Sequence, residues 1–166
     1  MNNITTKRGD TGTTSLADGT RVDKDNLRIE LNGELDELMA SLGLCRAASG
    51  QADPYATLQR QLMGLMALVA KPSLALPPAD EKRVKEAVER MEREINRCCP
   101  SSARFGFVLP GSDLADAALH MARAKARTCE RRMVALARTE PVDPAMLAYL
   151  NRLSDYLFAL AIGRMG

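Results

Sequence analysis

The most constraining feature of the sequence is the apolar pattern between residues 119 and 136. Apolar residues recur there at alternating spacings of three and four, at Leu119, Ala122, Ala126, Cys129, Met133 and Leu136. Because each residue of an α-helix turns by about 100°, this spacing lines one face of a helix. The pattern predicts a helix over about 113–139, capped by Ser112 or Asp113, with one face buried in a core.

Four further segments carry the same helical period between turn-forming residues. They lie at about 26–48, 55–71, 81–98 and 144–164. Asp80 is the expected cap of the third segment, and Pro144 begins the last. Gly64, inside the second, indicates either close packing or a simple loss of helix stability. Five helices with short connections and no alternating strand pattern predict an all-α, five-helix bundle with ferritin-like up-down packing, forming one domain over residues 1–166.

Composition excludes several functional classes. With 23 basic and 21 acidic residues, the net charge of +2 argues against nonspecific nucleic-acid binding. A single histidine disfavours a histidine-based metal site or catalytic triad, and the four cysteines show neither zinc spacing nor a disulfide framework. No apolar run is long enough to span a membrane, and the N-terminus has no signal-peptide core. We therefore expect a cytoplasmic protein, or a form already trimmed, that binds no membrane.

Charged side chains form a row beside the apolar face of the 113–139 helix. Arg123, Arg127, Glu130 and Arg131 stand at positions i, i+4, i+7 and i+8, within one arc of the helix surface. One interpretation is a solvated basic face with an Arg127–Glu130 pair. The other is a site for a polyanion, since guanidinium groups bind phosphate oxygens through two parallel hydrogen bonds.

The leader, residues 1–25, is polar and has no hydrophobic period. Its run from Thr6 to Ser15 combines glycines, hydroxyl groups and two cations, which are the components of a phosphate-binding loop. It is not a Walker A loop, because no Gly-Lys-Ser/Thr sequence closes it. A flexible N-terminal tail is the alternative interpretation.

Other polar and aromatic residues are ambiguous on their own. Asn151 and Asp155 stand one turn apart near Arg152, a pattern that also suits an interhelical hydrogen-bond network. Phe107 lies in an irregular, glycine-containing segment, where it either lines a site or plugs the end of the bundle. Asp36 is either part of a solvated acidic pair or the acceptor for an arginine from elsewhere.

Taken together, these motifs resemble the PduO-type ATP:cob(I)alamin adenosyltransferases. The matching segments run from Thr6 through Arg28 to Leu38, from Phe107 through Pro110 and His120 to Arg131, and from Tyr149 to Phe158. They cover the chain nearly end to end and in the family's order.

The resemblance implies a homotrimer of five-helix bundles with active sites between neighbouring subunits. It implies that Mg²⁺-ATP is held by the leader and by two helices, through Thr6, Lys7, Arg8, Gly9, Thr14, Ser15, Lys24, Arg127, Thr128, Glu130, Arg131 and Asn151. It places cobalamin near Phe107 and pairs Asp36 with Arg123 across the subunit boundary. A flavoprotein reductase and a cobalamin-dependent acceptor enzyme are the further partners expected.

The implied reaction is attack by reduced cobalt on the 5′ carbon of ATP, which expels triphosphate. This nucleophile carries no proton, so no general base is required, which suits a chain with one histidine. Arg127 and Lys7 are assigned to leaving-group charge, Glu130 to orienting an arginine, and Phe107 to an apolar wall at the corrinoid. For His120, a packing or interface role is preferred to cobalt ligation.

The sequence also departs from the family pattern. Thr128 stands where the family often has a second arginine, which predicts weaker triphosphate binding. Ser112, Met39 and Ile162 are smaller departures. Two alternatives therefore stay open: a noncatalytic bundle that binds ATP or corrinoid as a chaperone or sensor, and a purely structural oligomerisation bundle.

Overall fold

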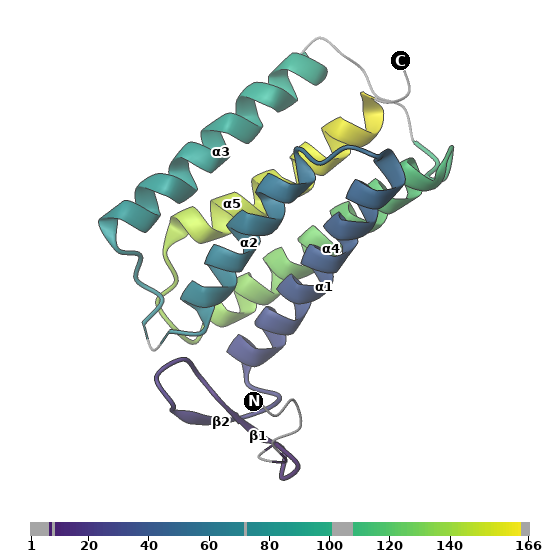
Figure 1. Ribbon diagram of the computed structural model, residues 1–166. Coiled ribbons are helices and arrows are strands. Elements are labelled where there is room, and N and C mark those ends of the chain that lie inside the picture. Colours follow the sequence, from purple (N-terminus) through teal and green to yellow (C-terminus); the bar gives the residue numbers. More distant parts are fainter. Residues whose placement is uncertain (1–6, 8, 72, 101–107, 164–166) are drawn as a thin grey trace.

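The computed structural model describes residues 7, 9–71, 73–100 and 108–163. Its described part contains five α-helices and one short β-hairpin, which confirms the predicted all-α bundle (Figure 1). The elements are β1 (Thr13–Ser15), β2 (Arg21–Asp23), α1 (Leu27–Ser49), α2 (Tyr55–Val69), α3 (Pro78–Cys98), α4 (Leu114–Ala137) and α5 (Pro144–Ile162). Thr6, Arg8 and Phe107, three of the predicted site residues, lie outside the described residues.

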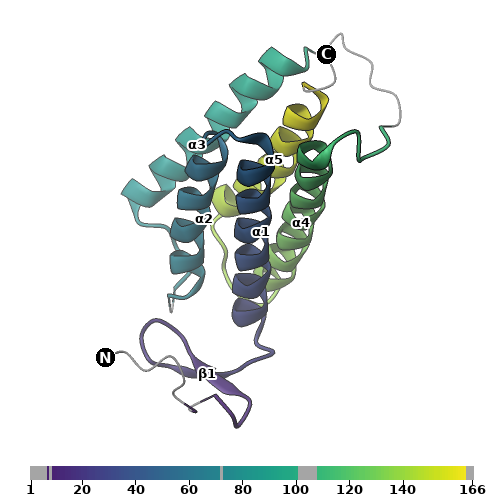
Figure 2. The ribbon, with the colours of Figure 1, turned by 45° about the vertical axis from the view of Figure 1, so that its right-hand side comes forward.

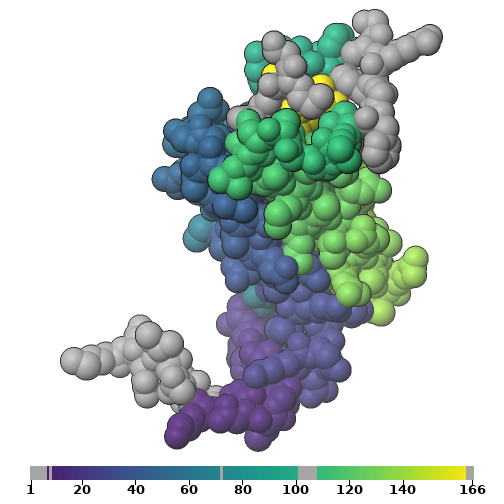
Figure 3. Space-filling view, turned by 90° about the vertical axis from the view of Figure 1, so that its right-hand side faces the viewer, coloured from purple at the N-terminus to yellow at the C-terminus, as the bar shows by residue number. Residues whose placement is uncertain are grey.

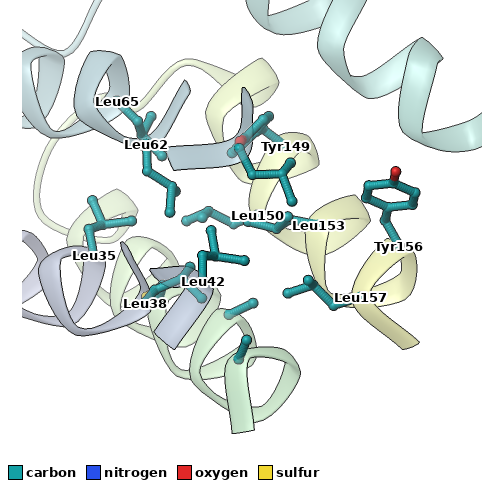
Figure 4. Close-up of a cluster of buried hydrophobic side chains, with 14 of the residues drawn as sticks. Leu35, Leu38, Leu42, Leu62, Leu65, Tyr149, Leu150, Leu153, Tyr156 and Leu157 are labelled. Atoms are coloured by element: carbon teal, nitrogen blue, oxygen red, sulfur yellow. The ribbon is translucent and has the colours of Figure 1, made fainter. Parts of the chain in front are cut away.

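The core lies between α1, α2, α4 and α5. Helix α4 packs between α1 and α5, α1 also packs on α2, and α3 packs on α5 (Figures 1 and 2). Leucines from three helices meet in the interior (Figure 4); Leu35, Leu38, Leu42, Leu62, Leu150, Leu153 and Leu157 are completely buried. Because aromatic residues make up only 4% of the chain, aliphatic side chains fill this interior.

Helix ends follow the expected capping chemistry, with one exception. Asn26 caps α1 by accepting a hydrogen bond from Arg28 N at 3.0 Å, and Asp113 caps α4. Gly50 ends α1 with φ of 68°, a left-handed conformation that glycine adopts without strain. The prediction that Asp80 caps the third helix is wrong. Helix α3 begins at Pro78, since proline suits the first helical position, and Asp80 lies in its first turn.

The leader forms a hairpin that the sequence did not predict. Strands β1 and β2 pair antiparallel with Thr14 opposite Val22, and Gly19 turns the chain with φ of 89°. The backbone N–H of Ala17 donates to Ala70 O at 2.9 Å, which ties the hairpin to the end of α2. Strands of three residues are too short to show an alternating pattern, so the leader read as a loop.

Arg28 joins three chain segments at the end of the bundle next to the hairpin. Its Nε donates to both carboxylate oxygens of Glu140, at 3.1 and 3.0 Å, in the connection between α4 and α5. Its Nη1 donates to the carbonyl oxygens of Val69, at 3.2 Å, and of Lys71, at the end of α2. Since only 4% of Arg28 is exposed, this charge depends on these partners. Arg28 therefore fixes the point at which the leader leaves the bundle.

Among the described residues, no helix is both long enough and apolar enough to cross a membrane.

Candidate functional site

The charged row on α4 opens onto a hollow. We call this the arginine hollow; its volume is about 370 Å³ and it is lined by Arg127, Glu130, Arg131, Val134, Ala135 and Arg138. The helical period explains the set, because positions 127, 131, 134 and 138 follow one another on one face. Arg138 was not among the predicted site residues, although continuing the same spacing by two turns beyond Arg131 would have found it.

Two other cations of α4, Lys125 and Arg132, have acidic partners in the described structure, unlike the arginines of the hollow. Lys125 forms ion pairs with Glu34 and, at 2.7 Å, with Glu37, and Arg132 pairs with Glu30 at 2.8 Å. These carboxylates all belong to α1. Within the part of the chain that the structure describes, no ion pair neutralises the arginines lining the hollow. A concave surface that carries uncompensated guanidinium groups suits a polyanionic ligand.

Glu130 is engaged by α5. Its Oε1 accepts a hydrogen bond from Nδ2 of Asn151 at 2.8 Å. The alternative of an Arg127–Glu130 ion pair is not realised in the structure. Two predicted ATP contacts, Glu130 on α4 and Asn151 on α5, are thus joined by a direct hydrogen bond.

The Asn151–Arg152–Asp155 group also serves packing between helices, as its alternative interpretation proposed. Nε of Arg152 donates to Glu92 of α3 at 2.9 Å, and its Nη1 donates to Asp155 at 3.2 Å. Asn151 faces α4 while Arg152 faces α3. Asn151 is therefore the member of this group that contacts a residue of the arginine hollow, Glu130.

Thr128 is the residue at which the sequence departs from the arginine often found in the family pattern. Its Oγ1 donates to the carbonyl oxygen of Ala124 at 3.3 Å and accepts from Nη2 of Arg131 at 2.9 Å. The hydroxyl group thereby holds the guanidinium of Arg131 one turn along the helix. Thr128 therefore orients the Arg131 side chain, whereas an arginine at this position would add a positive charge.

The leader folds its cations and glycines together. A Cβ added to Gly9 would lie 3.1 Å from Nζ of Lys24, so the lysine side chain packs directly against this glycine. The backbone N–H of Lys24 donates to Gly12 O at 2.9 Å. Lys7 is exposed and adopts a φ of 58°, which is uncommon for a residue other than glycine. Of the predicted contacts in the leader, Gly9 and Lys24 therefore lie side by side in the folded hairpin region.

Hydroxyl groups of β1 are oriented by β2. Nη1 of Arg21 donates to Ser15 Oγ at 3.4 Å, and its Nη2 bonds to Thr13 Oγ1. Thr14, between them, points to the other face of the hairpin. Arg21 was not a predicted site residue, because only the strand pairing places it beside Ser15.

Figures 1 and 2 place the hairpin beyond the end of the bundle at which α1 begins and α4 ends. The arginine hollow lies on the C-terminal half of α4, toward the same end of the bundle. The space-filling view shows the hairpin projecting beyond this end (Figure 3). The leader of a single chain is anchored to α2 at Ala70. That the leader and the hollow bind one ligand stays a prediction, in which the leader comes from a neighbouring subunit.

Asp36 and Arg123 do not pair within the chain. Asp36 is exposed on α1. The guanidinium carbon of Arg123, on α4, lies 5.9 Å from the centre of the Phe158 ring, and its buried Nε has no hydrogen-bond partner. The pair across a subunit boundary stays a prediction.

His120 lies inside the bundle, in agreement with a packing role. It is 5% exposed, meets Phe158 edge-on with ring centres 6.3 Å apart, and has Nε2 at 3.5 Å from Asp116 Oδ1. Asp116 is a buried carboxylate that accepts from the backbone N–H groups of Gly111, at 2.6 Å, and Ser112, at 3.1 Å. These hydrogen bonds, that of Gly111 foremost, lower the pKa of Asp116 although burial acts to raise it.

The described residues contain no group of three or more His, Cys, Asp or Glu side chains arranged to hold a metal ion. All four cysteines are free thiols, and burial raises the pKa of Cys45 to about 11 and that of Cys129 to about 12. These two thiols are core side chains.

Comparisons with known proteins agree with this geometry. Residues 4–163 match the family model described as cobalamin adenosyltransferase. A corrinoid adenosyltransferase of Citrobacter freundii is 38% identical over 97% of this chain and 94% of its own length. The corrinoid adenosyltransferase PduO of Salmonella typhimurium is 40% identical, and the match covers 95% of this chain but 48% of that protein. A solved variant of a PduO-type ATP:corrinoid adenosyltransferase from Lactobacillus reuteri, complexed with cobalamin and ATP, superposes with a TM-score of 0.84 at 29% identity, covering 98% of this chain and 90% of that one.

Proposed function

Because the chain belongs to the cobalamin adenosyltransferase family, we propose that the arginine hollow is the triphosphate end of its active site. The protein is a corrinoid adenosyltransferase, which moves the 5′-deoxyadenosyl group of ATP onto cob(I)alamin. The electron pair of cobalt forms the bond to the 5′ carbon, and the electrons of the broken carbon–oxygen bond leave with triphosphate. The observation that carries the proposal is the set of unneutralised arginines on one concave face of α4.

The residues of the chain supply position and charge rather than proton transfer. Arg127 and Arg131 face the triphosphate, where they offset the negative charge that grows as the leaving group departs. The bond from Thr128 fixes the rotamer of Arg131, and the bond from Asn151 fixes Glu130. Such preorganised groups need no rearrangement during the reaction, so they favour the transition state.

The leader completes the site from a neighbouring subunit in this proposal. Lys7, Gly9, Thr14, Ser15 and Lys24 bring cations, hydroxyl groups and backbone N–H groups suited to phosphate oxygens. The hairpin stands beyond its own bundle, which supports a contact with another copy of the chain (Figure 3). A homotrimer with its sites between subunits is the assembly that we propose.

Mg²⁺ fits this arrangement as a companion of ATP. Mg²⁺ commonly retains waters and binds substrate phosphates with few protein ligands. When bound, it neutralises triphosphate charge alongside the arginines. The residues of the chain bind the phosphate oxygens that Mg²⁺ does not bind.

The corrinoid is proposed to bind at the start of α4. Large apolar side chains are exposed there: Leu109 is 83% exposed, Leu114 66% and Met121 61%. An apolar surface of this kind favours a large, partly apolar ligand or a subunit contact. The proposed wall residue Phe107 directly precedes this region in the sequence. The reductase, the acceptor enzyme and the cytoplasmic location stay predictions.

The decisive experiment combines purified protein with ATP and chemically reduced cobalamin. Adenosylcobalamin formation is followed by visible absorbance, and triphosphate release is measured in parallel. We expect equal amounts of both products. Binding of ATP and corrinoid without turnover would instead favour the noncatalytic chaperone or sensor.

A further inference from the structure

A second and larger cavity lies between α2 and α3, outside the arginine hollow. Its volume is about 450 Å³, within the size range of small-molecule sites. It arises because α3 packs on α5, while α2 packs on α1. Tyr149 of α5 forms the floor where the two helices diverge.

The walls of this cavity are aliphatic. Leu65 and Leu68 of α2 and Val84 and Ala87 of α3 line it. Gly64 lines it as well, and a Cβ added there would meet no atom within 4 Å. The glycine therefore does not serve close packing of helices, one of its two interpretations from sequence. Its missing side chain makes the cavity wider at this position.

The floor carries a fixed polar pair. Tyr149 of α5 is 3% exposed, and its hydroxyl donates to Gln61 Oε1 at 3.0 Å. Figure 4 shows Tyr149 on the same side of the core as Leu65. The bond orients the Gln61 amide, whose Nε2 keeps hydrogen-bond donors available in the cavity.

The rim is cationic. Arg60, Lys71 and Arg83 line the cavity with Asp80 as the one acidic residue, so three positive charges and one negative leave +2. Asp80 accepts from Arg83 at 3.3 Å; the arginine side chain is 78% exposed and the aspartate side chain 29%. An aliphatic wall below a cationic rim is complementary to a molecule with an apolar body and one anionic head.

We propose that this cavity binds an aliphatic monocarboxylate. The hydrocarbon chain lies along Leu65, Leu68 and Val84, and the carboxylate lies at the rim beside Lys71 and Arg83. This site is separate from the arginine hollow and does not depend on the proposed triphosphate role of that hollow.

Isothermal titration calorimetry with hexanoate, octanoate and decanoate tests the proposal on the full chain. Affinity should rise by about 4-fold for each added methylene until the walls are covered. Decanol, which lacks the charge, should bind at least about 5-fold more weakly than decanoate. No measurable decanoate binding, or equal binding of decanol, would overturn the proposal.

Variants locate the site. Gly64→Leu fills the cavity and should weaken decanoate binding by more than about 10-fold, while Asn96→Leu, an exposed position elsewhere on α3, should leave it unchanged. The Lys71→Gln/Arg83→Gln double variant keeps the walls and should lower decanoate affinity by about 5-fold without changing decanol binding. Wild-type affinity in either the Gly64 variant or the double variant would refute the site. Adenosyl transfer by Gly64→Leu should remain at the wild-type rate.

Discussion

Thr128 and Arg131 are joined by a hydrogen bond of 2.9 Å in which Nη2 of the guanidinium donates to the threonine hydroxyl. We predict that Thr128→Val, which keeps the shape and removes the hydroxyl, raises the KM for ATP by about 3- to 10-fold, because a hydrogen bond of this kind is worth about 1 kcal/mol. The KM for corrinoid should not change. Steady-state kinetics with each substrate varied in turn makes the comparison.

Thr128→Arg is the complementary change, since it adds the guanidinium that the family pattern leads one to expect. We predict tighter ATP binding, with a lower KM for ATP in steady-state kinetics, because the added guanidinium brings one more positive charge to the triphosphate. Weaker ATP binding would mean that orienting Arg131 matters more than adding charge.

Arg127 should be required for turnover. Removal of a group that stabilises leaving-group charge commonly costs about 100-fold or more in rate. We therefore expect Arg127→Ala to lower kcat by at least about 100-fold, whereas Arg90→Ala, an exposed arginine of α3, should have almost no effect. Single-turnover measurements of adenosylcobalamin formation separate this chemical effect from product release. Near-normal turnover in the Arg127 variant would remove this residue from the mechanism.

The predicted pairing of Asp36 with Arg123 can be tested by reversing the charges. Asp36→Arg and Arg123→Asp should each weaken trimer assembly and lower activity, because each places like charges at the boundary. The double variant should recover part of both properties, since it restores an opposite-charge pair. Sedimentation analysis measures assembly. Unchanged assembly in both single variants would contradict the pairing.

Arg28 should contribute strongly to stability. Arg28→Ala leaves two carbonyl oxygens at the end of α2 and the carboxylate of Glu140 without their donor. We expect a loss of about 2–3 kcal/mol in the free energy of unfolding, below the full value for a buried pair because a third of the Glu140 side chain is exposed. Urea denaturation measures this loss, and Arg93→Ala on the exposed face of α3 is the control.

Asp116 should make the free energy of unfolding depend on pH in the acidic range. Its pKa is lower in the folded protein than in the unfolded chain, so its contribution is complete above the unfolded value, near pH 4, and is lost as the pH falls through the folded value. Asp116→Asn should be about 1 kcal/mol less stable than the wild type at pH 7. The difference should narrow as the pH falls below about 4, because the carboxyl group of Asp116 is then protonated in the wild type. Urea titrations across this pH range provide the measurement.

The sequence alone determined the helices and the face on which the key arginines stand. The spacing of Leu119, Ala122 and Ala126 fixed a buried face of α4, and the same period placed Arg127 and Arg131 together. These inferences succeeded because helical periodicity depends only on residues within a few positions of one another. The family resemblance then supplied the activity.

The tertiary structure decided which side chains are partners. Arg28 and Glu140 lie 112 residues apart, and Glu130 meets Asn151 only because α4 and α5 pack at a particular rotation and offset. The same packing places carboxylates of α1 beside Lys125, while Arg127 has no acidic partner among the described residues. It also leaves open space beside Gly64. A periodic pattern states which face of a helix is buried, but the rotation and offset of that face against its neighbour result from packing the whole core.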